Sequence, residues 1–229
     1  MVPKISDYLK KHMQSIAQYL ESNTAVSLGD INAKSRTASL FGQDGKPVRV
    51  VLAQETTLWT PWQVSAFDAS SDRCSMDLVI TSDNHLGEFA DAVDTAVFDF
   101  VKGSKERFIK GNADLAATFR PCRRKASKEG YNDTLRCKMT LSATKCSAKA
   151  WDGNKVPMSP AELKELDWPA CKLAVSVAVS GVYFQAGTWG PILNVHMLQV
   201  APQDRSCPFG SDGIMKANLK CQNQWSVPP

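Results

Sequence analysis

Apolar and polar residues alternate strictly in two segments of this chain. From Arg73 to Thr81 every second residue is apolar, and the same holds from Thr134 to Leu141. Successive side chains of a strand point to opposite faces of a sheet, so each segment is a predicted strand with one buried face. The polar face of the second strand carries Arg136 and Lys138. Its solvent-facing side is therefore predicted to be cationic.

Apolar residues recur at helical spacing in two other segments. Residues 3–22 carry an apolar residue at steps of three or four, and so do residues 84–110. This period predicts an amphipathic helix in each segment. Turn residues separate several further short apolar runs, which are predicted strands. These runs are 25–28, 37–41, 47–53, 62–67, 115–119, 144–151, 172–185 and 191–200.

The order of these elements predicts the fold class. Strands do not alternate one for one with helices, so a βαβ architecture is excluded. The pattern favours a mainly β chain with two helices, of the α+β class, built as an elaborated OB-fold-like barrel or sandwich. We expect residues 1–24 to form an N-terminal helical arm and residues 25–201 to form the β domain, with helix 84–110 inserted. Residues 202–229 read as an irregular C-terminal tail.

Composition places the chain among ordinary globular proteins. It has 229 residues, of which 43% are hydrophobic, and no apolar run reaches the ~20 residues that a membrane-spanning helix needs. The first residues lack the apolar core of a secretory signal. The seven cysteines are odd in number and widely spaced, which favours free thiols in a reducing compartment such as nucleus, cytoplasm or viral factory. We therefore expect an intracellular, non-secreted protein without a membrane partner.

Charge is unevenly distributed along the chain. The net charge is +4, yet thirteen basic and only four acidic residues lie between Lys102 and Lys149. Such a basic band is the electrostatic footprint of a polyanion-binding protein, although a solvated surface without this role explains it too. The candidate phosphate-binding residues are Arg120, Arg123, Arg124, Lys125, Lys128, Arg136 and Lys138.

Aromatic residues supply the second requirement of a single-stranded nucleic-acid site. Bases stack on aromatic side chains while cations follow the backbone. Trp62, Tyr183 and Trp189 are the stacking candidates, and Trp189 is expected to be exposed because it lies in a glycine-rich turn. Tyr183 and Phe184 are neighbours, so in a strand one faces a ligand and the other faces the core.

Local signatures of enzymes are missing from the sequence. It contains no phosphate-binding loop, no G-x-S-x-G element and no pair of zinc-ligand motifs. The three histidines lie far apart in the sequence, which favours structural roles over general-base catalysis. We expect a non-enzyme without metal or cofactor, although a site assembled only in space leaves no such mark.

Two short motifs carry a family resemblance. The element Leu58-Trp59-Thr60-Pro61-Trp62 and the later run Gly181-Val182-Tyr183-Phe184, followed by Gly187-Thr188-Trp189-Gly190, lie in an order of strands and helix spanning roughly residues 50–200. This combination resembles the single-stranded-DNA-binding-like proteins of nucleocytoplasmic large DNA viruses, particularly those of algae. The resemblance implies an elaborated OB barrel that coats single-stranded DNA in replication or recombination. Some phage proteins with this role end in an acidic tail, whereas Lys216 to Pro229 contains no acid.

Two non-catalytic functions therefore remain open, beside an enzyme whose site assembles only in space. The first is a non-catalytic, sequence-tolerant protein that binds single-stranded DNA or RNA and self-associates. The second is a structural or interaction protein, a virion or filament component, which assembles through the N-terminal helix and the C-terminal tail. A common surface for residues 120–138 and the 183–190 hairpin would favour the first.

Overall fold

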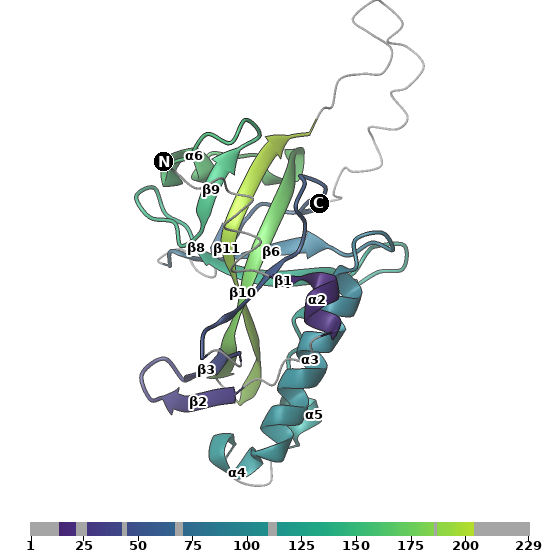
Figure 1. The fold of residues 1–229 in the computed structure, drawn as a ribbon, viewed down its shortest axis with the longest axis vertical. Helices are drawn as coiled ribbons and strands as arrows, with labels where there is room; N and C mark the ends of the chain where they lie inside the picture. Colours follow the sequence, from purple (N-terminus) through teal and green to yellow (C-terminus); the bar gives the residue numbers. More distant parts are fainter. Residues whose placement is uncertain are drawn as a thin grey trace, which may run out of the picture.

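One mixed β-sheet organises the molecule (Figure 1). The computed structural model describes residues 14–21, 27–42, 45–66, 71–109, 114–185 and 187–203, and every strand within these ranges belongs to that sheet. The strands are β1 (Gln14–Ser15), β2 (Ser27–Asn32), β3 (Thr37–Phe41), β4 (Val48–Val51), β5 (Ser65–Ala66), β6 (Arg73–Val79), β7 (Arg123–Arg124), β8 (Thr134–Thr140), β9 (Lys149–Asp152), β10 (Cys171–Gln185) and β11 (Thr188–Pro202). The helices are α2 (Ile16–Glu21), α3 (Leu86–Gly103), α4 (Lys105–Phe108), α5 (Leu115–Thr118), α6 (Pro160–Lys164) and the 3-10 turn η1 (Trp168–Ala170).

The antiparallel hairpin of β10 and β11 is the centre of the sheet. Each strand has 15 residues, and two register shifts interrupt their pairing. β10 pairs with β4 along its first half and with β3 near its end, while β11 pairs with β8 and β9. The order β1-β4-β10-β11-β8-β6-β5 follows. Two long strands therefore bring the early strands and the later basic segment onto one sheet.

Helix α3 covers the inner face of this sheet and lies along one side of the hairpin (Figure 1). The side chain of Asn84 accepts a hydrogen bond from the Leu86 amide at 3.2 Å, which satisfies one donor at the start of the helix. The buried stripe of α3 belongs to the same core as Leu135 and Cys137 of β8. Alternate residues of β8 consequently point away from the helix.

The predicted fold class is confirmed. The chain is mainly β with helices, and its single mixed sheet is consistent with an elaborated OB-like fold. The strongly alternating segments form β6 and β8, and the segments 172–185 and 191–200 form the long hairpin. The helix expected at 84–110 is present as α3 followed by the separate turn of α4.

Two predicted elements are wrong within the described residues. Residues 3–22 were expected to be one helix, but Gln14 and Ser15 form β1 on the edge of β4 and helix starts only at Ile16. Ser15 and Gln18 bond reciprocally between side chain and backbone amide at 3.2 and 2.8 Å, a capping box that fixes the start of the helix there.

The segment 115–119 was expected to be a strand and forms helix α5 instead. Asp114 caps it, accepting hydrogen bonds from the amides of Ala116 and Ala117. The cap and the two alanines, which are strong helix formers, outweigh the short apolar run. Helix α6 was not foreseen from the sequence, although Ser159 and Glu162 form a capping box at its start.

The expected termini fall largely outside the described ranges. Residues 1–13 of the predicted arm and residues 204–229 of the predicted tail are among them. Across the residues that are described, no helix has the length and apolar character that crossing a membrane requires.

Gly181 of β10 provides a test of the pairing between β10 and β3. A Cβ atom at this position would lie 2.1 Å from the carbonyl oxygen of Ala38 in β3. We expect Gly181→Ala to lower the free energy of unfolding by at least ~2 kcal/mol, because backbone has to move. Urea denaturation measures the change.

Gly103→Ala is the matched control. No atom lies within 4 Å of a Cβ at the end of α3. This variant is expected to leave stability unchanged or raise it by up to ~1 kcal/mol. Equal effects of the two substitutions would contradict the close β3–β10 contact.

Candidate nucleic-acid interface

The outer face of β6 and β8 carries the first charged groups of the candidate site. The two strands pair so that Ser75 faces Lys138 and Asp77 faces Arg136. Leu135, Cys137 and Met139 are buried, which leaves Arg136 and Lys138 on the opposite, half-exposed side. The strict alternation in the sequence thus places two cations on one face of the sheet.

Two further arginines approach this face from the preceding loop. Arg124 in β7 pairs with Thr134, so it lies on the side of β8 that carries Arg136 and Lys138. The amide of Arg120 donates to the carbonyl oxygen of Trp189 at 2.8 Å, which fixes Arg120 beside the end of β11. The basic loop is therefore attached to the sheet at both positions.

Tyr183 completes the cluster from the central hairpin. The ammonium nitrogen of Lys138 lies 4.5 Å from the centroid of the Tyr183 ring, a cation–π contact. Tyr183 pairs across the hairpin with Gly190, which has no side chain to crowd the ring. A Cβ atom at position 190 would lie 3.4 Å from the Tyr183 ring and 2.1 Å from the Arg120 carbonyl oxygen. We call Arg73, Arg120, Arg124, Arg136, Lys138 and Tyr183 the cationic face.

Positive charge on the cationic face is largely uncompensated. Within the described ranges, Arg73, Arg120, Arg124 and Lys138 form no ion pair with a carboxylate, and the buried Nε of Arg124 has no hydrogen-bond partner. Burial lowers the pKa of Lys138, and the nearby charges of Arg124, Arg73 and Arg136 lower it further. Like charges held together in this way favour an anionic ligand.

A row of paired residues extends this surface across the sheet. Arg49 in β4 pairs with Ala178 in β10, which pairs with Asn194 in β11, which pairs with Lys138 in β8. The amide nitrogen of Asn194 donates to the hydroxyl of Ser180 at 3.0 Å. The middle of the row therefore carries short polar or small side chains, and cations lie at both ends.

Three of the predicted phosphate-binding residues are engaged by carboxylates. Arg136 forms two 2.8 Å hydrogen bonds with Asp77. Arg123 contacts Asp91 at 2.6 Å and Asp133 at 2.8 Å, and the exposed Lys125 contacts Asp133 at 3.0 Å. Arg123 and Lys125 thus anchor the loop to α3 and to the segment before β8, Arg136 links β8 to β6, and all three contribute less net charge than the sequence indicates.

The expectation that Trp189 is exposed is wrong. It lies in β11 rather than in the turn and is 2% exposed. Its ring packs against Phe98, Phe119 and Phe184, and its indole nitrogen donates to the Thr118 hydroxyl at 3.1 Å. Trp189 therefore belongs to the core and offers no free ring face for a base.

Tyr183 and Phe184 point to opposite faces of the sheet, as predicted, while binding of a ligand by Tyr183 stays a prediction. Phe184 is buried and stacks on Phe108, whereas Tyr183 is half-exposed on the outer face. Trp62 is exposed, at 59%, and precedes the edge strand β5, which pairs with β6. Lys128 is exposed in the loop after β7. The roles of Trp62 and Lys128 stay predictions.

Comparisons with known proteins give structural neighbours but no family. No family model matches the chain, and no curated protein sequence matches it. The single-stranded DNA-binding protein of bacteriophage Enc34 is similar, with a TM-score of 0.42, 11% identity, and 87% of this chain and 99% of that chain covered. Its complex with single-stranded DNA gives a TM-score of 0.39 and 14% identity, over 80% and 99% of the chains. The single-stranded DNA-binding protein gp2.5 of bacteriophage T7 gives 0.41 and 12%, over 76% and 94%.

Sequence reasoning missed Arg49, Arg73 and Asn194. They lie outside the basic band or carry no charge, and they join the surface only through strand register. Alternation in 48–51, where Val48 and Val50 are buried, is the signal that places Arg49 on the outer face. The same alternation places Asn194 on the outer face, between the buried Leu193 and Val195, but an uncharged side chain adds nothing to a search for clustered charge.

Other titratable groups give no sign of a metal centre. Across the described ranges, no three histidine, cysteine, aspartate or glutamate side chains are placed to hold a metal ion. His196 is half-buried, and burial together with Arg49 and Lys149 lowers its pKa. Burial also raises the pKa of the Cys122 and Cys137 thiols. These groups are predominantly uncharged at neutral pH.

Asp133 predicts a pH-dependent contribution to stability. Burial raises the pKa of its carboxyl, but hydrogen bonds from the Ala126 amide, Lys125 and Arg123 outweigh it and lower the pKa to about 2. Its stabilisation is therefore present above the unfolded-state pKa of ~3.9 and lost as pH falls through about 2. We expect Asp133→Asn to cost about 2 kcal/mol at pH 7, by urea denaturation.

The control is Glu129→Gln in the same loop, whose exposed side chain forms no ion pair within the described residues. This variant is expected to leave stability within ~0.5 kcal/mol of the parent. A cost of Asp133→Asn that stays constant down to pH 2 would contradict the assigned role.

Proposed function

We propose that this chain is a non-catalytic protein that binds single-stranded DNA on the cationic face. The observation that carries the proposal is the set of cations without carboxylate partners around the ring of Tyr183, with Lys138 placed 4.5 Å from its centroid. Phosphates neutralise such cations, while a base stacks on an accessible ring. Both requirements of single-stranded binding meet at one place.

The bound strand crosses the sheet along the row from Lys138 to Arg49. Neighbouring strands lie ~4.8 Å apart, so the three steps from β8 to β4 span about 14 Å. The small side chains of Ala178 and Ser180 leave the centre of this row open between the cations at its ends. This geometry supports a backbone that contacts Lys138 at one end and Arg49 at the other.

Binding of this kind is sequence-tolerant. Arginine and lysine contact phosphates that every nucleotide shares, and every base has a face that stacks on tyrosine. A duplex already stacks its bases on one another, so the contribution of Tyr183 is available only to an unpaired strand. The proposal therefore favours single strands over duplex and predicts strong dependence on salt.

Three further parts of the proposal rest on the sequence. They are a role in replication or recombination, self-association on the strand, and membership of the family of large DNA viruses whose motifs the chain resembles. A reducing compartment fits the thiols of Cys74, Cys122, Cys137 and Cys146, which are free cysteines. The candidate residues Arg123, Lys125, Lys128 and Trp62 would contribute at the margins of the cationic face.

Removing unpaired cations tests the phosphate contacts. Lys138→Ala and Arg124→Ala are each expected to weaken binding of a fluorescent oligothymidylate and to reduce the slope of log K against log salt by ~0.7. Fluorescence anisotropy at several salt concentrations measures both quantities. Lys102→Ala, in the last turn of α3, removes the same charge away from the face and is expected to leave the slope unchanged.

A salt-independent affinity, or equal effects of Lys138→Ala and Lys102→Ala, would rule the proposal out. Large assemblies that form without nucleic acid, detected by light scattering, would favour the structural-protein alternative.

Tyr183 tests the stacking contact separately. Tyr183→Leu is expected to weaken binding by ~1–3 kcal/mol, whereas Tyr183→Phe retains the ring and stays close to the parent. The matched control is Tyr131→Leu, since Tyr131 is exposed in the basic loop and outside the cationic face. If Tyr183→Phe weakens binding as much as Tyr183→Leu, the hydroxyl and not the ring is the binding group.

A further inference from the structure

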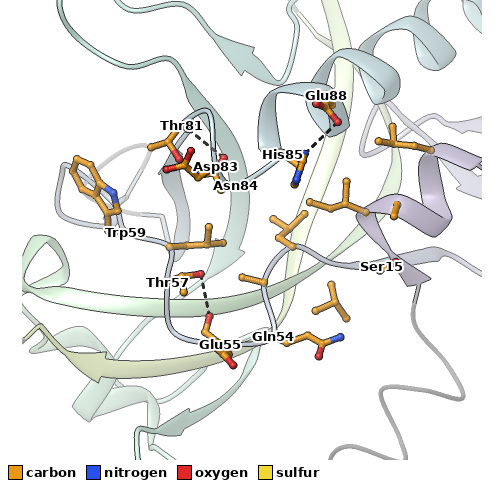
Figure 2. A pocket seen from close by; sticks show the side chains of 17 residues that line it. Ser15, Gln54, Glu55, Thr57, Trp59, Thr81, Asp83, Asn84, His85 and Glu88 are labelled. Atoms are coloured by element: carbon orange, nitrogen blue, oxygen red, sulfur yellow. Dashed lines mark hydrogen bonds and ion pairs between the residues drawn. The ribbon is translucent and has the colours of Figure 1, made fainter.

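A pocket separate from the cationic face lies between α2, the segment after β4 and the start of α3 (Figure 2). Its volume is about 790 Å³. Apolar side chains from α2 and from the segment after β4 line it, among them Ile16, Leu20, Leu52 and Leu58, whereas the start of α3 contributes polar side chains. Leu20 lines the pocket and is still 37% exposed, so part of this apolar side chain is open to solvent. The pocket therefore offers an apolar surface that a partner can cover.

Charge around the pocket has one sign. Glu55, Asp83 and Glu88 contribute three carboxylates, and no lysine or arginine is among the lining residues. His85 lies 3.4 Å from Glu88, with both side chains largely exposed. Figure 2 shows Glu55 on one side of the pocket and Glu88 on the other. An occupant of matching chemistry is apolar in the middle and basic at its margins.

The C-terminal part of this chain has that chemistry. Residues 213–229 contain two lysines and no acid. Met215 and Leu219 are four apart, and so are Lys216 and Lys220. On a helix this spacing gives an apolar stripe directly beside a cationic one.

Backbone hydrogen bonds and β10 connect the end of the described chain to one wall of the pocket. The amide of Gln203 donates to the Ala170 carbonyl oxygen at 2.8 Å. Three residues further along, Leu173 exchanges hydrogen bonds of 2.8 and 3.0 Å with Leu58, which lines the pocket. The ten residues from 204 to 213 span up to ~33 Å when extended, whereas the three residues from Ala170 to Leu173 span ~10 Å. A short connection also gives the segment a high effective concentration at the pocket.

We propose that the pocket binds the chain's own basic C-terminal segment, residues 213–229. Met215 and Leu219 contact the apolar wall formed by Leu20 and Leu52, and the two lysines face the carboxylates at the rim. The inference is independent of single-stranded DNA binding, because none of the pocket residues belongs to the cationic face.

Site-specific photo-crosslinking in the full chain tests this directly. A benzoyl-phenylalanine at position 20 is expected to crosslink to residues within 213–229, as mapped by mass spectrometry. The same group at position 156 is the control, since Val156 is also exposed, at 57%, but lies in the turn after β9. Mixing isotope-labelled with unlabelled chains shows whether each crosslink is within one chain, as the proposal requires.

A charge swap tests the electrostatic part. Glu55→Lys with Glu88→Lys is expected to lower the crosslink yield at least fivefold, and adding Lys216→Glu with Lys220→Glu is expected to restore it. The proposal would be overturned by crosslinks to residues 1–13 or by crosslinks between labelled and unlabelled chains. It would equally be overturned if no crosslink to the tail formed, or if the charge swap left the crosslink yield unchanged. None of these results affects the salt dependence of DNA binding, so the two proposals fail separately.

Discussion

The pairing of Phe184 with Trp189 across the central hairpin is the contact on which the cationic face depends. Both rings point inward, where they join Phe98, Phe108 and Phe119 in one aromatic cluster. Each such ring pair contributes ~0.5–1.5 kcal/mol beyond the area it buries. Because strand neighbours point to opposite faces, burying this pair turns Tyr183 and Gly190 outward. The packing of Phe184 and Trp189 in the core thus places Tyr183, the stacking candidate, on the outer face.

The same cluster connects the hairpin to the basic segment. Trp189 donates from its indole to Thr118 in α5, and its carbonyl oxygen accepts from the amide of Arg120. Residues more than sixty positions apart in the sequence are thereby held side by side.

The sequence predicted which face of the sheet each strand side chain occupies better than it predicted the site that these side chains form. Alternation in 134–141 placed Arg136 and Lys138 correctly, since it depends only on neighbours along the chain. Which cations remain unpaired depends instead on Asp77 and Asp133, and only strand register and loop closure bring those acids to their partners. Trp189 was misplaced for a related reason. The turn is shorter than its glycines suggest, so position 189 falls inside the strand, on its buried side.

The buried carboxylate of Asp94 has a consequence for how the molecule recognises a ligand. It accepts hydrogen bonds from the amides of Cys122 and Arg123 at 2.8 and 3.3 Å, in the middle of the basic loop. Together with Asp133, it holds that backbone in place in the ligand-free chain. Under the proposed function, the loss of conformational entropy on association would fall on the flexible nucleic acid rather than on the protein. In the proposed complex the face would be a rigid template to which the strand conforms.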